Sequence, residues 1–161
     1  MSRDTLPAVK TGLHHQKIVV VAATYNEKYT TPLLQNCLDE LKRNAPNVQV
    51  DIVRVPGAFE VPVMVNRAIK RPPVGSCGPD AVIALGVILR GSTAHEDLIG
   101  EAITRELLHT ACDTLVPVIH EVLLLNNEEQ AEERCKGEQL NRGTEAARAA
   151  IAMLNLLDAQ G

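Results

Sequence analysis

The stretch Ala81-Val-Ile-Ala-Leu-Gly-Val-Ile-Leu89 is the most apolar segment of the chain, and it decides the fold class. An uninterrupted apolar run of this length is typical of a strand in a parallel sheet whose two faces are both covered by helices. A second run of this kind, rich in β-branched residues, spans residues 17–25. Two such strands predict an α/β domain in which residues 81–89 form the central strand.

Strand and helix patterns alternate outward from this segment. Two further strands are predicted at residues 48–55, where apolar and polar residues alternate, and at residues 116–124. Right-handed crossovers then favour a four-stranded parallel sheet of order 2-1-3-4, which is a flavodoxin-like three-layer sandwich. The predicted helices are one that Thr31 caps and Pro32 begins, two at 61–69 and 97–112, a short one capped by Asn126 or Asn127, and a last one from Gly143 or Thr144.

Length and charge limit the classes of protein to which the chain can belong. Its 161 residues predict one domain over residues 17–161, after a segment 1–16 that is flexible or pairs with a neighbouring subunit. Sixteen Lys and Arg against 20 Asp and Glu give a formal net charge of -4, so no nucleic-acid partner is expected. No apolar run is long enough for a membrane span and no signal peptide is visible, so we expect a cytoplasmic protein.

The four cysteines argue against a metal centre built on thiolates. Cys37, Cys77, Cys112 and Cys135 are tens of residues apart and form no C-x-x-C pair. This spacing suits reduced thiols better than a zinc site or a disulfide framework, so no metal is expected.

Ligands of such a sheet bind at the carboxyl ends of the strands, which are predicted at residues 25–26, 57–60, 88–95 and from His120 onward. The third end is the richest, because glycine and two hydroxyls lie between a central strand and a helix. Backbone N–H groups and the helix dipole favour an anion there, so Gly91, Ser92 and Thr93 are predicted to hold a phosphate. The alternative is that Ser92 or Thr93 only caps the helix.

Three titratable side chains near these ends each have a structural explanation beside a functional one. His95 can move protons at neutral pH, although a lone histidine is more often a surface or packing residue. Glu60 can bind hydroxyl groups, or it can complement a helix dipole from the first turn. Arg134 closes an acidic run and can pair with carboxylates along its own helix.

Seven segments together resemble the lumazine synthase family in their order and spacing. The most specific of them are Val55-Pro-Gly-Ala-Phe-Glu60 and Leu89-Arg-Gly-Ser-Thr-Ala-His95. The resemblance covers about residues 17–157. The other segments are Tyr25-Asn-Glu27, Pro117-Val-Ile119, Glu129-Gln-Ala-Glu-Glu-Arg134, Asn141-Arg-Gly143 and Ala149-Ala-Ile-Ala-Met153.

The resemblance implies an enzyme of riboflavin biosynthesis that works without a cofactor or a metal. The family condenses 5-amino-6-ribitylaminopyrimidinedione with 3,4-dihydroxy-2-butanone 4-phosphate and forms 6,7-dimethyl-8-ribityllumazine, phosphate and water. Imine formation, phosphate loss and ring closure need proton transfer and an anion-binding group, but no covalent nucleophile of the enzyme.

The resemblance also gives each candidate residue a role. His95 is implied to be the proton carrier. The residues implied to bind the pyrimidine ring or its ribityl chain are Tyr25, Asn26, Ala58, Phe59, Glu60, Ile88, Leu89 and His120. Those implied to bind the phosphate are Gly91, Ser92, Thr93 and Arg134, the last reaching in from a neighbouring subunit.

The chain departs from the family pattern at several of these places. Glu96 stands where the family usually has an aromatic residue after the histidine, and Glu138 stands where it usually has a lysine. His120 and Glu121 replace a Phe-Gly pair, so an imidazole takes the place of the ring that closes over the substrate of a neighbouring subunit. We expect an active enzyme with altered affinity for its substrates.

Assembly is implied as well. The family forms pentamers with active sites between neighbours, and some members close twelve pentamers into a 60-subunit shell. The segment 135–142 is as short as in the shell-forming members, which favours a shell here, and an association with riboflavin synthase is implied. Independently, the Ala-rich last helix has so little surface to pack on that burial against another subunit is expected.

Two other functions fit parts of the sequence. One is a catalytically weak paralogue that keeps the subunit fold and acts as a shell protein or binds flavin or lumazine. The other is a flavodoxin-like or receiver-like signalling domain, which the topology alone permits. A receiver needs an acidic pair after its first strand, and Tyr25-Asn26 stands there instead.

Overall fold

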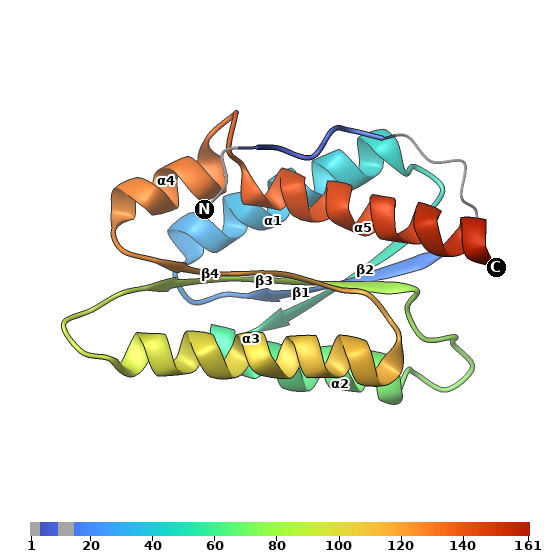
Figure 1. Cartoon of the computed structure of the whole chain (residues 1–161), viewed down its shortest axis with the longest axis horizontal. Coiled ribbons are helices and arrows are strands. Elements are labelled where there is room, and N and C mark those ends of the chain that lie inside the picture. Colours follow the sequence, from blue (N-terminus) through green and yellow to red (C-terminus); the bar gives the residue numbers. More distant parts are fainter. Residues whose placement is uncertain (1–3, 10–14) are drawn as a thin grey trace.

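A parallel sheet lies between two layers of helices in the computed structural model, which describes residues 4–9 and 15–161 (Figure 1). Its four strands are parallel and their order is β2-β1-β3-β4. The predicted fold class and strand order are therefore confirmed. The strands are β1 (Lys17–Ala23), β2 (Gln49–Val55), β3 (Ala81–Leu89) and β4 (Val118–Leu125).

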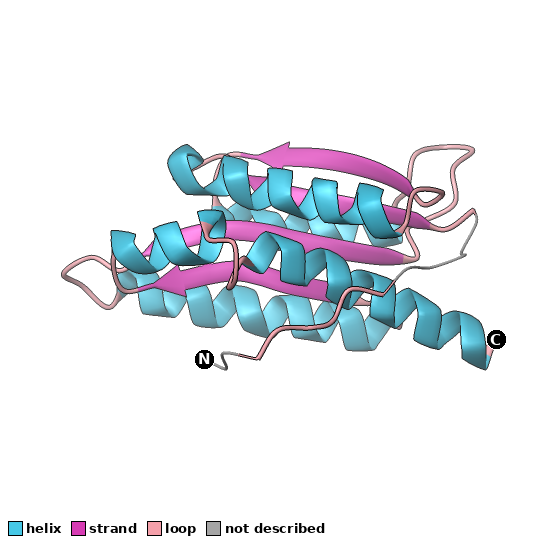
Figure 2. Cartoon of the chain, turned by 90° about the horizontal axis from the view of Figure 1, so that it is seen from above, coloured by secondary structure: helices cyan, strands magenta, loops and turns pink. Residues whose placement is uncertain are grey.

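The helices divide between the two faces of the sheet, as the views from the side and from above show (Figures 1 and 2). Apolar side chains of both layers meet the sheet in two separate core clusters, one on each face. The buried strand β3 contributes to both clusters, as its apolar run predicts. One face carries α1 (Glu27–Asn44), α4 (Glu128–Lys136) and α5 (Arg142–Gln160), and the other carries η1 (Ala58–Glu60), α2 (Val61–Lys70) and α3 (His95–Thr114).

The start of α1 differs from the prediction. The helix begins at Glu27, and Pro32 lies inside it rather than at its first position. The reason is tertiary packing: Tyr29 and Thr30 are buried, so continuing the helix toward the sheet places both in the interior. This burial outweighs the local preference of proline for a helix start.

The last helix starts where its glycine allows close packing on α1. A Cβ atom on Gly143 would lie 2.1 Å from the backbone oxygen of Leu33, so no larger residue fits. Next to it, Ala146, Ala147 and Ala150 are fully buried within the chain. The expectation that this alanine face needs another subunit to cover it is therefore wrong, because α1 and the sheet already do so.

The described part of the N-terminal segment lies along the same helical layer (Figure 1). The backbone N–H of Leu6 donates to the carboxylate of Glu145 at 3.1 Å, and Arg148 donates to the carbonyl of Leu6 at 2.7 Å. Arg148 also pairs with the buried Glu40 of α1. Residues 4–9 thus contact their own chain, residues 1–3 and 10–14 lie outside the described residues, and pairing with a neighbour stays a prediction.

The cysteines and the absence of an apolar run long enough for a membrane span are two further features on which the sequence made predictions. All four cysteines are free, with Cys37 and Cys135 buried and Cys77 and Cys112 exposed. In the part of the chain that the structure describes, no helix is both long enough and apolar enough to cross a membrane.

Candidate active site

A cavity of about 430 Å³ opens at the carboxyl ends of β1, β2 and β3. Three connections surround it, namely the β1–α1 turn, η1 and the β3–α3 loop. Its lining residues are Tyr25, Asn26, Gly57, Ala58, Phe59, Glu60, Val87, Ile88, Leu89, His95, Glu96 and Ile99.

The β1–α1 turn positions the first two of these residues. Asn26 adopts a left-handed backbone conformation with φ of 59°, which asparagine tolerates better than most residues. Its side-chain amide donates to the backbone oxygen of Val87 at 2.8 Å, which fixes the turn against β3. Tyr25 is consequently left 73% exposed at the mouth of the cavity. An exposed aromatic ring in a chain with only three aromatic residues indicates a surface for stacking.

The short helix η1 supplies the second side of the cavity. Glu60 accepts a hydrogen bond from the backbone N–H of Gly57 at 2.9 Å, so one of its oxygens caps this turn. The structural explanation for Glu60 is thus partly realised, while the residue also lines the cavity. Phe59 is 65% exposed beside it, and the buried Val61 anchors the turn in the core.

The β3–α3 loop presents unpaired backbone donors. Within the described residues, no acceptor is found for the N–H groups of Gly91, Ser92 and Thr93, and all three residues are exposed. Ala94 is the N-cap of α3 and no side chain caps the helix; the hydroxyl of Thr93 only approaches the N–H of His95 at 3.4 Å. These donors are free to bind an anion, although the three residues do not themselves line the cavity.

Arg90 holds this loop in place. Its guanidinium pairs with Asp97 in the first turn of α3, with hydrogen bonds of 2.8 and 2.6 Å. A second, short hydrogen bond joins it to Asn126, which follows β4. Arg90 is therefore engaged within the protein and fixes the entry to α3.

His95 is the first residue of α3 and lines the cavity with its neighbour Glu96 and with Ile99 one turn later. The imidazole is exposed, and no side chain of the described residues pairs with it. It is therefore free to reach a ligand in the cavity.

His120 does not lie at a strand end. The strand β4 runs from Val118 to Leu125, so His120 is its third residue, and the predicted position at the carboxyl end is wrong. Its Nδ1 accepts from the N–H of Val122 at 3.1 Å, so the proton is on Nε2, which donates to the hydroxyl of Thr104 at 2.8 Å. Burial lowers the pKa of His120, which agrees with a neutral ring.

Glu121 points to the other face of β4, where it meets α5. Its carboxylate lies 3.4 Å from the guanidinium of Arg142. Burial raises the pKa of Glu121 to about 7, Arg142 and Arg134 act to lower it, and Glu145 acts to raise it. The pKa of Glu121 is raised because the effect of its burial outweighs that of the two arginines.

Arg134 lies on α4 and is only 12% exposed. Its nearest carboxylate is that of Glu133, 3.9 Å from Nε, which is the limit of an ion pair. Neither Arg134 nor His120 lines the cavity of its own chain. Arg134 thus has a long ion pair within its own chain and does not line the cavity of that chain.

Eight of the predicted residues therefore surround one cavity, and five do not. The eight are Tyr25, Asn26, Ala58, Phe59, Glu60, Ile88, Leu89 and His95, and the five are Gly91, Ser92, Thr93, His120 and Arg134. Sequence reasoning missed Gly57, Val87, Glu96 and Ile99 as lining residues. The spacing of His95 and Ile99 by four residues could have shown that both face the same way.

The polar groups of the cavity suit a ligand with hydrogen-bond donors and a flat ring. Two carboxylates and one imidazole line it, and no lysine or arginine does so. An apolar groove of similar size between α2 and α3 offers less, because its polar residues Asn66 and Glu106 bond to each other. Among the described residues, no group of three or more His, Cys, Asp or Glu side chains could hold a metal ion.

A comparison with known families matches nearly the whole chain. The family model described as 6,7-dimethyl-8-ribityllumazine synthase matches residues 15–158, which include every strand and all the residues that line the cavity.

Proposed function

This chain belongs to the 6,7-dimethyl-8-ribityllumazine synthase family, an enzyme family that catalyses the lumazine-forming step of riboflavin biosynthesis, and we propose that it is itself an active synthase. It condenses 5-amino-6-ribitylaminopyrimidinedione with 3,4-dihydroxy-2-butanone 4-phosphate and needs no cofactor. The observation that carries the proposal is the cavity, which gathers an imidazole, two exposed rings and two carboxylates at the carboxyl ends of three strands.

The pyrimidine binds between the β1–α1 turn and η1. Tyr25 and Phe59 are exposed there, so the flat ring can stack on them without moving the core. Asn26, Ile88 and Leu89 surround the ring, and Ala58 and Glu60 face the ribityl chain. A carboxylate suits a chain of hydroxyl groups, since it accepts several hydrogen bonds and donates none.

The phosphate binds the free N–H groups of Gly91, Ser92 and Thr93. A dianion also needs cationic charge, and none of the cavity's lining residues supplies it. Arg134 of a neighbouring subunit provides that charge in this proposal, since its ion pair with Glu133 in its own chain is long, at 3.9 Å. His120 of the neighbouring subunit closes the pyrimidine end.

His95 carries the protons of the reaction. The amine of the pyrimidine attacks the ketone, and water leaves to form an imine. Elimination of phosphate follows, and the second ring closes when the ribityl-bearing amine attacks the remaining carbonyl and a second water leaves. Each of these steps moves a proton. The imidazole is exposed at the cavity and pairs with no side chain of the described residues, so it can reach the substrate as a general acid or base.

The proposed assembly follows from the division of the site between subunits. Residues 17–161 form one domain, and pentamers place Arg134 and His120 beside the cavity of the next subunit. The short connection between α4 and α5 favours closure into a 60-subunit shell in the cytoplasm, where riboflavin synthase can associate with it.

A lumazine-forming assay with the purified protein tests the function. We expect the two substrates to give the absorbance and fluorescence of 6,7-dimethyl-8-ribityllumazine together with one equivalent of phosphate. A protein that carries a yellow or fluorescent ligand but forms no product would instead be a binding or shell paralogue. Sedimentation at neutral pH checks the assembly: a mass near five subunits refutes the shell, and a monomer refutes the shared site.

A further inference from the structure

Glu96 has a feature that the functions described so far do not use. Its Oε2 atom is buried and has no hydrogen-bond partner within the described residues. Glu96 lines the cavity beside His95, and its Oε1 lies 3.1 Å from the position that a Cβ on Gly91 would occupy. The carboxylate therefore lies between the cavity and the β3–α3 loop, which is predicted to bind the phosphate.

A purely structural role does not account for this arrangement. An acidic residue in the first turn of a helix stabilises it by facing the helix N-terminus or solvent. Asp97, the next residue, does this while exposed and paired with Arg90. Glu96 adds no ion pair, and burying an acceptor without a donor destabilises a protein, since the lost hydrogen bonds to water are not replaced.

A ligand in the cavity is the natural source of the missing donor. The cavity is lined by Glu60 and Glu96 and by no cationic side chain. Glu60 already shares one oxygen with the N–H of Gly57. Of the two carboxylates, that of Glu96 is therefore the one whose oxygens accept no hydrogen bond from the described residues. They remain available to accept one from a bound molecule.

We propose that Glu96 is a substrate-binding residue that accepts a hydrogen bond from an N–H or O–H group of a bound substrate, at the end of the cavity next to the phosphate loop. This inference rests on the proposed function, because it takes the two substrates from there. The donor is an amine or hydroxyl of the pyrimidine substrate or the free hydroxyl of the butanone phosphate. Glu96 thus places a negative charge beside the loop that binds the phosphate. At that position it favours a neutral hydrogen-bond donor of the substrate over a second anionic group.

Equilibrium binding tests the proposal without requiring turnover. Calorimetric titration of each substrate separately would compare the wild type with Glu96→Gln and Glu96→Leu. We expect the dissociation constant of one substrate to rise about tenfold or more, with the larger loss for leucine, because a hydrogen bond to a charged group is removed. The substrate whose affinity falls identifies the donor.

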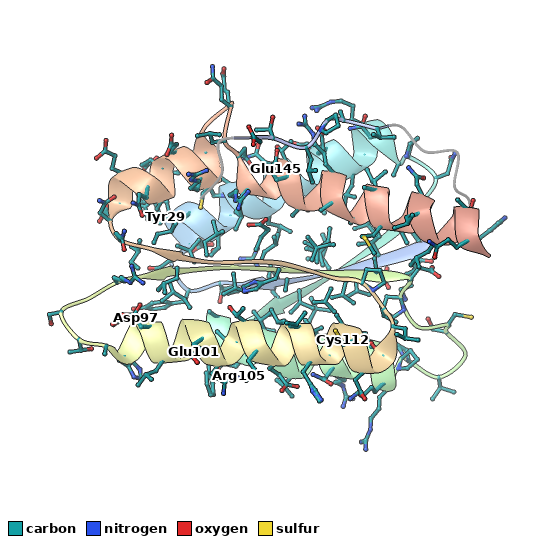
Figure 3. All side chains as sticks on the ribbon, viewed as in Figure 1. Tyr29, Asp97, Glu101, Arg105, Cys112 and Glu145 are labelled. Atoms are coloured by element: carbon teal, nitrogen blue, oxygen red, sulfur yellow. The ribbon has the colours of Figure 1, made fainter. Side chains whose placement is uncertain are left out.

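Stability and a matched variant separate this role from a structural one. Glu96→Leu removes an unpartnered buried oxygen, so the melting temperature should stay equal or rise. Glu101→Gln removes the same charge from the exposed side of α3, where Glu101 pairs with Arg105, and should leave both affinities unchanged (Figure 3).

Three results would overturn the proposal. The first is that both affinities stay within twofold of the wild type. The second is that Glu96→Gln only tightens the binding of inorganic phosphate, since Glu96 would then act as a repelling charge alone. The third is a fall in melting temperature that accompanies the loss of affinity. A wild type that binds its substrates but forms no lumazine refutes the proposed activity, and the binding comparison still decides the role of Glu96.

Discussion

Polar side chains are left unpaired at the cavity beside the ends of β1, β2 and β3. On the strand β4 they are paired. In the cavity, no side chain of the described residues pairs with the imidazole of His95, and Glu96 keeps an oxygen that is unpaired among those residues. On β4, both nitrogens of His120 are bonded and Glu121 lies against Arg142. Unpaired groups destabilise the protein but are available to a ligand, whereas groups paired within the chain are held in one geometry. The two regions therefore differ in how freely their polar side chains can meet a substrate.

Replacing His95 should give the largest effect, because it removes the proton carrier from the cavity. His95→Ala is expected to lower kcat by about 10² to 10⁴, which corresponds to about 3 to 5 kcal/mol in the barrier. Folding and assembly should be unaffected, since the imidazole has no partner in the protein. Steady-state kinetics measure the effect, with the exposed His109→Ala on the same helix as the control. An unchanged kcat would remove His95 from the mechanism.

Replacing Glu121 should change stability rather than chemistry, and in a pH-dependent way. Its pKa in the folded protein is about 7 against an ordinary 4.5, so the folded state binds a proton that the unfolded state releases. The associated stability is present below pH 4.5 and is lost as the pH rises through 7. Glu121→Gln should avoid this loss, which is on the order of 3 kcal/mol.

The difference is measured by urea unfolding at pH 5 and pH 8 and equal protein concentration. We expect the free energy of unfolding of the variant, relative to that of the wild type, to be higher at pH 8 than at pH 5. A constant difference at both pH values would show that Glu121 does not titrate in this range.

Replacing Arg134 tests whether the β4–α4 region serves the cavity of a neighbour. Arg134→Ala should raise KM for the butanone phosphate about 10-fold to 100-fold, since only this substrate carries the dianion. KM for the pyrimidine should change little. Lys136→Ala removes a cation from the same helix as a control. Equal changes in both KM values would instead make Arg134 structural.

The smallest effect is expected at the cap of α4. The side chain of Asn127 accepts from the N–H of Gln130 at 2.9 Å, so Asn127→Ala should lower the free energy of unfolding by about 1 kcal/mol. Since α4 carries Arg134, KM for the butanone phosphate should rise slightly as the helix frays. Asn127→Asp keeps the cap and should restore both values. Thermal unfolding and kinetics check this, and an unaltered melting temperature in Asn127→Ala would show that the cap is dispensable.

Most of the fold could be predicted because buried positions give the sequence a regular pattern of apolar residues. The bounds of β3 agree with its apolar run, since both faces of that strand are covered. The start of α1 was missed, because the contacts that bury Tyr29 are invisible in the local sequence. The predicted strand 116–124 nearly matches β4, so the error at His120 was to count a residue within the strand as part of its carboxyl end.

The candidate site was predictable where its residues adjoin strand ends, and not elsewhere. Residues such as Tyr25 and Glu60 directly follow strands, and parallel strands bring their carboxyl ends together. The orientation of Glu96 depends on how α3 meets the loop at Gly91, which no spacing reveals. The partners of Glu121 come from α4 and α5, far along the chain, so its raised pKa also had no local signal.

The hydrogen bond between Val122 and His120 helps to protect this protein from aggregation through its sheet edge. β4 is an outer strand of the sheet, and an open strand edge invites pairing with any extended chain nearby. The ring of His120 occupies the N–H of Val122, so one of the donors that an incoming strand would need is already taken. Burial lowers the pKa of this imidazole, which favours the neutral ring that accepts this hydrogen bond, so His120 helps to protect the edge of β4 from aggregation.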